Sequence, residues 1–175
     1  RKTKRLNQKE PMEITGRDAL IDLIEHLQRR HNVEHGDFPH GLWMIDRQTM
    51  GYARATIVLQ HQGSTIRAGN AEIIVGDGAS LMLVSVQDWD DDAVHLAHLH
   101  ARVGRDASYR QALVSLGGDL VRISSSVDFA DPGGEAELLG LYFADAGQHL
   151  EHRLFVDHNA PHTRSNVDYR GALQG

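Results

Sequence analysis

The feature that most constrains the fold is a turn that recurs about every 28 residues. VGDGAS begins at Val75 and VGRDAS begins at Val103, 28 residues later, and Ala136 of GGEAE follows Ala107 by a further 29. Each period also holds two short apolar runs of strand type. Such self-similarity is typical of units that bury their apolar sides by stacking on their neighbours.

The runs between these turns have a strand-like texture from Tyr52 onward. They read ATIVLQ, AEIIVG, SLMLVSVQ, AVHLAHLHARV, YRQALVSL, DLVRISSSVDF, AELLGLYF and HLEHRLFVDH. The pattern predicts a mainly β protein built as a β-solenoid, whose side chains alternate between the interior and the surface. A sandwich or a small barrel is the alternative, because strand content alone does not fix which strands pair.

The first fifty residues differ from this β region. Four apolar residues fall at i, i+3, i+4 and i+7, on one face of a helix: Leu20, Leu23, Ile24 and Leu27. This spacing predicts one amphipathic helix over roughly 16–31. Glycine and proline then interrupt the pattern between Asp37 and Gly41, which indicates a linker. We therefore divide the chain into an N-terminal segment, 1–50, and a β core, 51–175.

Charge and lysine content exclude two classes of function for the core. Residues 51–175 carry 9 arginines and 16 acidic residues, a net charge of −7. Such a surface is poorly suited to phosphate backbones, so we expect no nucleic-acid partner. All three lysines lie in the first nine residues, so the core cannot supply the lysine of a phosphate-binding loop.

The 175 residues contain no cysteine. They can form no disulfide, no thiolate zinc site and no cysteine-ligated iron–sulfur cluster. No run of about 18 apolar residues occurs, and the basic start is not followed by the apolar segment of a signal peptide. We predict neither a membrane span nor a signal peptide, and a reducing cytoplasm as the compartment.

Twelve histidines are the best candidates for chemistry. In HLAHLH, His98 and His100 point to the same side of a strand, about 7 Å apart. Such a pair holds a metal only if a neighbouring strand adds a third ligand. The other interpretation, which we favour, places His98 and His100 with Arg102 in an outward polar row.

The histidines near the C-terminal end allow two interpretations. His152 shares a parity with apolar neighbours, which predicts a buried neutral imidazole with a backbone hydrogen-bond partner, or else a proton or metal relay. Asp157, His158 and His162 have the composition of a site with two histidines and one carboxylate, yet Pro161 indicates a turn. We predict no catalytic residue and no metal site. The candidate metal ligands that we retain are His98, His100, His152 and His158.

Three ordered stretches carry a family resemblance. They are VSVQDWDDDAVHLAHLHARVGRDASYRQALVSLGGDLVRISSSVDF, GGEAELLGLYFADAGQHLEHRLFVDH and SNVDYRGALQG. Together they resemble the SufB/SufD family of iron–sulfur cluster assembly proteins, and within it the core of actinobacterial SufD. The resemblance covers about residues 52–175.

The resemblance implies a right-handed parallel β-helix that acts as a non-catalytic scaffold subunit. It implies a complex of the SufBCD type, in which the chain pairs with a SufB-like paralogue and a SufC-like ATPase. It also implies that no cofactor is bound directly, and that an iron–sulfur cluster is present only together with the partners.

Departures from the family pattern lead to further expectations. The family continues past YRGALQG, so we predict a core truncated at its C-terminal end and self-association through the open end of the β-helix. A later histidine–glycine–alanine stretch of the family is not among the 175 residues. Where relatives have PxCRSN, residues 161–166 read PHTRSN, without the thiol.

A rival hypothesis is a histidine-rich, metal-dependent enzyme on a small β-barrel or cupin-like frame. It would use some of His98, His100, His152 and His158. Strand pairing separates the two hypotheses. Parallel stacking of consecutive coils supports the scaffold, whereas antiparallel closure with histidines that converge inside supports the enzyme.

Overall fold

The computed structural model describes residues 40–45 and 54–174, with side chains described from residue 54 onward. Its ten strands are β1 (His40–Ile45), β2 (Arg54–Gly63), β3 (Ile66–Val75), β4 (Ser80–Trp89), β5 (Val94–Val103), β6 (Ser108–Ser115), β7 (Leu120–Phe129), β8 (Glu135–Ala144), β9 (His149–Asp157) and β10 (Arg164–Leu173). In the part of the chain so described, no helix has the length and apolar character needed to cross a membrane.

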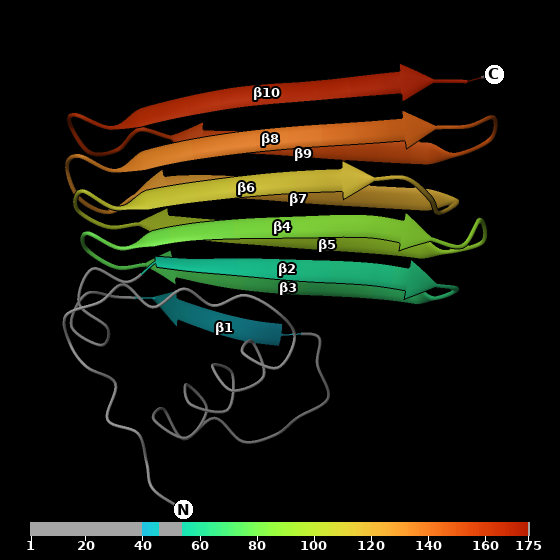
Figure 1. Ribbon diagram of the computed structural model, residues 1–175, viewed down its shortest axis with the longest axis horizontal. Coiled ribbons are helices and arrows are strands. Elements are labelled where there is room, and N and C mark those ends of the chain that lie inside the picture. The colour runs from blue at the N-terminus through green and yellow to red at the C-terminus, as the bar shows by residue number, and fades with distance from the viewer. Residues whose placement is uncertain (1–39, 46–53, 175) are drawn as a thin grey trace, which may run out of the picture.

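The strands form two parallel sheets that the chain visits alternately. One, the odd sheet, has the order β1-β3-β5-β7-β9, and the other, the even sheet, has the order β10-β8-β6-β4-β2. In Figure 1 the even strands run left to right at the front and the odd strands return behind them, while the chain climbs from β2 to β10. This path is a right-handed coil, and the predicted β-solenoid is confirmed.

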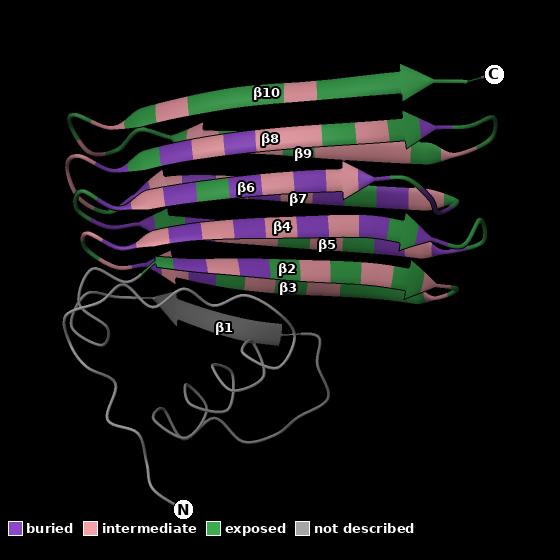
Figure 2. Cartoon of the chain, in the orientation of Figure 1, coloured by how far each residue is buried: buried purple, intermediate pink, exposed green. Residues whose placement is uncertain are grey.

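The register keeps equivalent residues of successive coils in line. Ile73, Ala101, Val127 and Val156, for example, follow one another across β3, β5, β7 and β9. Figure 2 shows the resulting alternation of buried and more exposed residues clearly along β4 and β6. The inward apolar residues of the two sheets fill the space between them, so this part of the coil has a packed core and not a channel.

The recurring turn has a defined backbone conformation before β4, β6, β8 and β10. Two residues before each of these strands, the chain adopts a positive φ: 68° at Gly78, 52° at Asp106, 83° at Gly133 and 59° at His162. The amide N–H of each of the first three donates to a carbonyl in the turn of the next coil, as Gly78 does to Arg105 at 2.8 Å. The repeat in the sequence therefore marks a stack of left-handed turn residues.

Substitution at this turn position gives a first prediction. Gly133→Ala places a side chain on a backbone with positive φ, and its Cβ would overlap the Asp106 carboxylate of the preceding turn. We expect the variant to lose about 2 kcal/mol of unfolding free energy in urea denaturation. In the D106A background the same change should cost only about 1 kcal/mol, because the overlap is gone. Equal losses in both backgrounds would contradict the stacked turn.

The amphipathic helix over 16–31 lies outside the described residues. β1 is a strand that the sequence does not predict, because HGLWMI is short, lacks the alternation of the later runs and begins inside the glycine-rich linker. All eight strand pairings are parallel, which excludes the antiparallel closure of a barrel or cupin for the described strands.

Candidate functional site

Four polar side chains meet on the outer surface of the odd sheet. His98 and His100 come from β5, and Ser126 and Asp128 come from the neighbouring β7; we call them the outer histidine cluster. Ser126 Oγ lies 2.9 Å from His100 Nδ1 and 3.2 Å from His98 Nε2. His100 Nε2 lies 2.9 Å from Asp128 Oδ1. The predicted outward polar row is confirmed.

The contacts in this cluster fix the direction of each hydrogen bond. A carboxylate only accepts, so the proton of a neutral His100 belongs on Nε2, toward Asp128. His100 Nδ1 then accepts the hydroxyl proton of Ser126, and Ser126 Oγ accepts from His98 Nε2. These contacts run in one line from His98 through Ser126 and His100 to Asp128.

This arrangement resembles a serine, its base and an orienting carboxylate, but it does not present a free nucleophile. Both imidazoles lie against Ser126 Oγ, which also lies 3.5 Å from the Leu99 carbonyl. A substrate would have to displace one of them. Among the side chains of residues 54–174, no three histidine, aspartate or glutamate groups are placed to hold a metal ion. The geometry best suits a surface ladder that ties β5 to β7.

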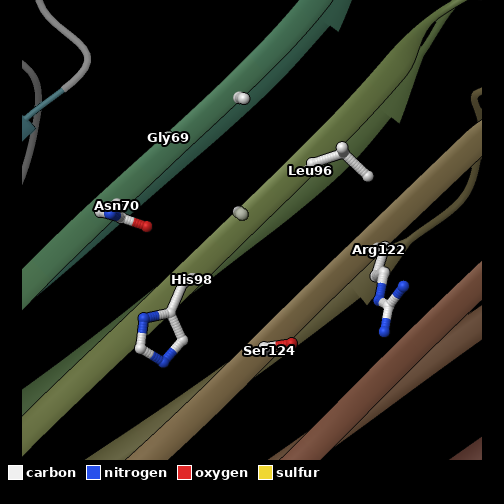
Figure 3. Close-up of a pocket in the computed structure, with 8 residues that line it drawn as sticks. Gly69, Asn70, Leu96, His98, Arg122 and Ser124 are labelled. Carbon is white, nitrogen blue, oxygen red and sulfur yellow. The ribbon is translucent and has the colours of Figure 1, made fainter.

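A shallow hollow of about 450 Å³ lies beside the cluster on the same face. Its lining residues are Ala68, Gly69, Asn70, Leu96, Ala97, His98, Arg122 and Ser124. Figure 3 shows His98, Ser124 and Arg122 spread along the sheet rather than aimed at one point. Arg122 Nε also pairs with Glu151 at 3.2 Å, so its charge is already matched. The hollow follows from the small side chains of β3 and β5.

A second group of polar residues lies inside the coil. His61 of β2, Gln87 and Trp89 of β4 and His95 of β5 form what we call the inner histidine cluster. Gln87 Oε1 accepts from Trp89 Nε1 at 2.9 Å and lies 2.7 Å from His95 Nδ1. Because an amide oxygen only accepts, the His95 proton sits on Nδ1. The rings of His61, Trp89 and His95 pack with centroids 5.2 to 5.3 Å apart.

Burial keeps these inner histidines neutral. It lowers the pKa of His61 to about 4, with a smaller effect from the nearby Arg67. It also lowers the pKa of His95 to about 4, assisted by the charges of His61 and Arg67. Two neutral imidazoles beside an amide can donate and accept hydrogen bonds. They carry no charge with which to bind an anion at neutral pH.

His152 also points into the coil, on the apolar parity that the sequence predicts. Its Nε2 lies 2.9 Å from Ser115 Oγ, so its partner is a side-chain hydroxyl and the predicted backbone partner is wrong. Register explains the difference, since inward Ser115 faces β9 across the interior. The rings of Tyr142 and Tyr169 pack edge-on against His152, and burial lowers the pKa of the imidazole.

Residues 158–163 form the turn between β9 and β10, as Pro161 predicts. His158 stacks on Phe129 with ring centroids 5.0 Å apart. Its two ring nitrogens lie 2.7 Å from Thr163 Oγ1 and 2.9 Å from Ser165 Oγ. His162 is exposed and holds the positive φ of the turn. The stretch therefore shows turn chemistry rather than a metal site.

The four candidate histidines do not come together. His98 and His100 lie on the outer surface, His152 lies inside, and His158 lies in a turn. The sequence predicts neither the inner histidine cluster nor the partners Ser126 and Asp128 of the outer one. A signal for the inner cluster is the alternation of the strands, since His61, Gln87 and Ser115 occupy equivalent inward positions of successive even strands.

Sequence comparison with known proteins finds a matching family and similar proteins. The family described as "SUF system FeS cluster assembly, SufBD core domain" matches residues 31–175. An iron–sulfur cluster assembly SufBD family protein of Mycobacterium leprae is 55% identical over 124 residues, which are 71% of this chain and 32% of that protein. One of Mycobacterium bovis is 56% identical over 121 residues, which are 69% of this chain and 30% of that protein.

The chain thus spans about a third of the length of these curated relatives. No solved structure matches it significantly.

Proposed function

Because the chain belongs to the SufBD family of iron–sulfur cluster assembly proteins, we propose that it is a non-catalytic scaffold subunit of a SufBCD-type complex. Its partners in this proposal are a SufB-like paralogue and a SufC-like ATPase, working in the cytoplasm. The observation that carries the proposal is the match of the core-domain family over a stretch that includes every strand of the continuous parallel coil.

The chemistry of the side chains supports a scaffold role. Iron–sulfur clusters are held mainly by cysteine thiolates, and the 175 residues contain none. The thiolates for a nascent cluster would therefore come from outside these 175 residues. His95, His98 and His100 lie within hydrogen-bond distance of glutamine or serine side chains, and His61 packs against the rings of Trp89 and His95. These contacts hold the coil together.

The proposal is tested by anaerobic affinity purification of the tagged chain from its host, with partners identified by mass spectrometry. Recovery of the paralogue or the ATPase is the expected result. A chain that is purified alone, under conditions in which the paralogue and the ATPase recover each other, would contradict the proposed role.

The same sample tests the prediction that the chain holds no metal of its own. We expect far less than one equivalent of iron or zinc per chain by elemental analysis after the partners are removed. The H98A/H100A variant should then show the same metal content as the unmodified chain. A stoichiometric metal that disappears in this variant would favour the metal-dependent enzyme instead.

A further inference from the structure

The outer surface of the even sheet carries an apolar patch that its position in the fold does not explain. Its centre consists of Val86 of β4, Val114 of β6, Leu116 just after β6, and Leu139, Leu141 and Phe143 of β8. The row of Leu139 extends the patch through Ala112 and Val84 to Val58 of β2, which is 56% exposed. Leu141 is 49% exposed, Leu116 is 46% exposed and Phe143 is 42% exposed. Monomeric proteins rarely leave such side chains together in water without a binding role.

The patch is local and has a charged border. Across the ladder to β10, Leu139 faces Asp168 and Leu141 faces Arg170, two residues that pair with each other at 3.1 Å. On β6 and β8 it ends at the Arg110–Glu137 ion pair. The outer surface of the odd sheet has asparagine, histidine, serine and arginine at the corresponding middle rows. The apolar character is therefore specific to this part of the even sheet.

The size of the patch indicates what it can bind. Four strands spaced about 4.8 Å apart and five residues of about 3.3 Å each give an area of roughly 19 Å by 17 Å, or about 320 Å². Two copies meeting through this patch alone would bury only about 640 Å², whereas stable interfaces bury about 1,200 Å² or more, so the patch suits one element of a partner that also makes contacts elsewhere. One helix with its side chains is about 10–12 Å wide, and three turns span about 16 Å.

We propose that this patch binds the apolar stripe of a single amphipathic helix, about three turns long, presented by a partner subunit. The inference rests on the proposed function, which supplies the partner. β-Strand addition is a different mode and needs a free sheet edge, whereas the centre of the patch lies on β4, β6 and β8, which are paired on both sides. Leu141 lies in the middle row of the patch and would be the main anchor.

Binding experiments test the patch with a matched control. Leu141→Asp should weaken the complex of the chain with its SufB-like paralogue at least tenfold in dissociation constant, measured by biolayer interferometry without oxygen. Leu96→Asp changes a leucine of similar exposure, 42%, on the outer surface of the odd sheet. It should change the dissociation constant less than twofold. Circular dichroism and urea denaturation check that both variants keep the fold.

Thiol labelling identifies the occupant without a disruptive charge. The chain has no cysteine, so L141C and L96C each supply one unique thiol. In the complex, maleimide labelling of L141C should slow at least tenfold, whereas labelling of L96C should not change. A benzophenone attached at L141C should cross-link to a partner peptide whose apolar residues recur at i, i+3, i+4 and i+7.

The outcomes separate this inference from the proposed function. If the unmodified chain binds the paralogue and L141D binds equally well, the docking patch is wrong and the scaffold role stands. If L141C is unprotected, or cross-links to a second copy of this chain or to a β-strand, the inference is also overturned. If the unmodified chain binds neither the paralogue nor the ATPase, both proposals fail.

Discussion

Gly140→Ala should destabilise the coil by about 3 kcal/mol, the largest effect that we expect from a single methyl group. Gly140 on β8 pairs with Tyr169 on β10, and the Tyr169 ring lies directly over the glycine. A Cβ at residue 140 would overlap three carbons of that ring. Overpacking of this kind forces side chains or backbone to move, which costs about 1–3 kcal/mol and occasionally more. Urea denaturation measures the loss.

A double-mutant cycle shows whether the ring is the cause. Tyr169→Ala removes the ring, so adding Gly140→Ala to that variant should cost little more, with a coupling free energy of about 2 kcal/mol. Tyr142 lies over Gly171 in the same way, so the two glycines and two tyrosines alternate between β8 and β10. Additive losses in the cycle would contradict this packing of ring on glycine.

Acidification should lower the free energy of unfolding between about pH 6.5 and pH 4. Burial lowers the pKa of His61 and of His95 to about 4 in the folded protein, whereas an exposed histidine in the unfolded chain has a pKa near 6.5. In this window the unfolded chain binds more protons than the folded one, so the unfolding free energy falls as pH falls. Each proton contributes at most about 1.4 kcal/mol per pH unit. Above pH 6.5 these histidines are neutral in both the folded and the unfolded chain, so their burial does not lower the free energy of unfolding there.

Two variants check the origin of the acid sensitivity. His95→Gln retains a hydrogen-bonding side chain but does not titrate, so the slope of unfolding free energy against pH should become smaller, while His61 and His152 still contribute to it. Leu96→Gln changes an exposed, non-titrating residue of the same strand and should leave the slope as it is. Urea denaturation at several pH values gives the slopes. An unchanged slope in H95Q would contradict the buried, neutral pair.

The repeat and the parity of the strands carry the part of the fold that the sequence predicts. Turn chemistry is local, so Gly78, Asp106 and Gly133 leave a readable period in the chain. The alternation of side chains likewise places His98 and His100 outside and His152 inside. His162 obscures the last repeat, because a histidine there occupies the conformation that glycine prefers.

The parts that the sequence does not predict depend on contacts between coils and between sheets. Ser126 meets His98 across 28 positions of the chain, and His61 meets His95 across the interior from the opposite sheet. Such pairs depend on register and on the separation of the two sheets, which no local pattern encodes. The apolar patch is visible in the sequence. AELLGLYF has apolar residues at both inward and outward positions near Leu139 and Leu141, whereas a half-exposed strand alternates apolar and polar residues.

The central claim is that the chain contributes a scaffold, and its partners the chemistry, to iron–sulfur cluster assembly. The most direct test is anaerobic reconstitution of cluster assembly from the SufB-like paralogue and the SufC-like ATPase, with and without this chain. We predict that adding the chain increases the rate of cluster formation, followed by absorbance, and that the chain alone neither hydrolyses ATP nor assembles a cluster. Cluster formation that proceeds equally well without it, or ATP hydrolysis by the chain alone, would contradict the account.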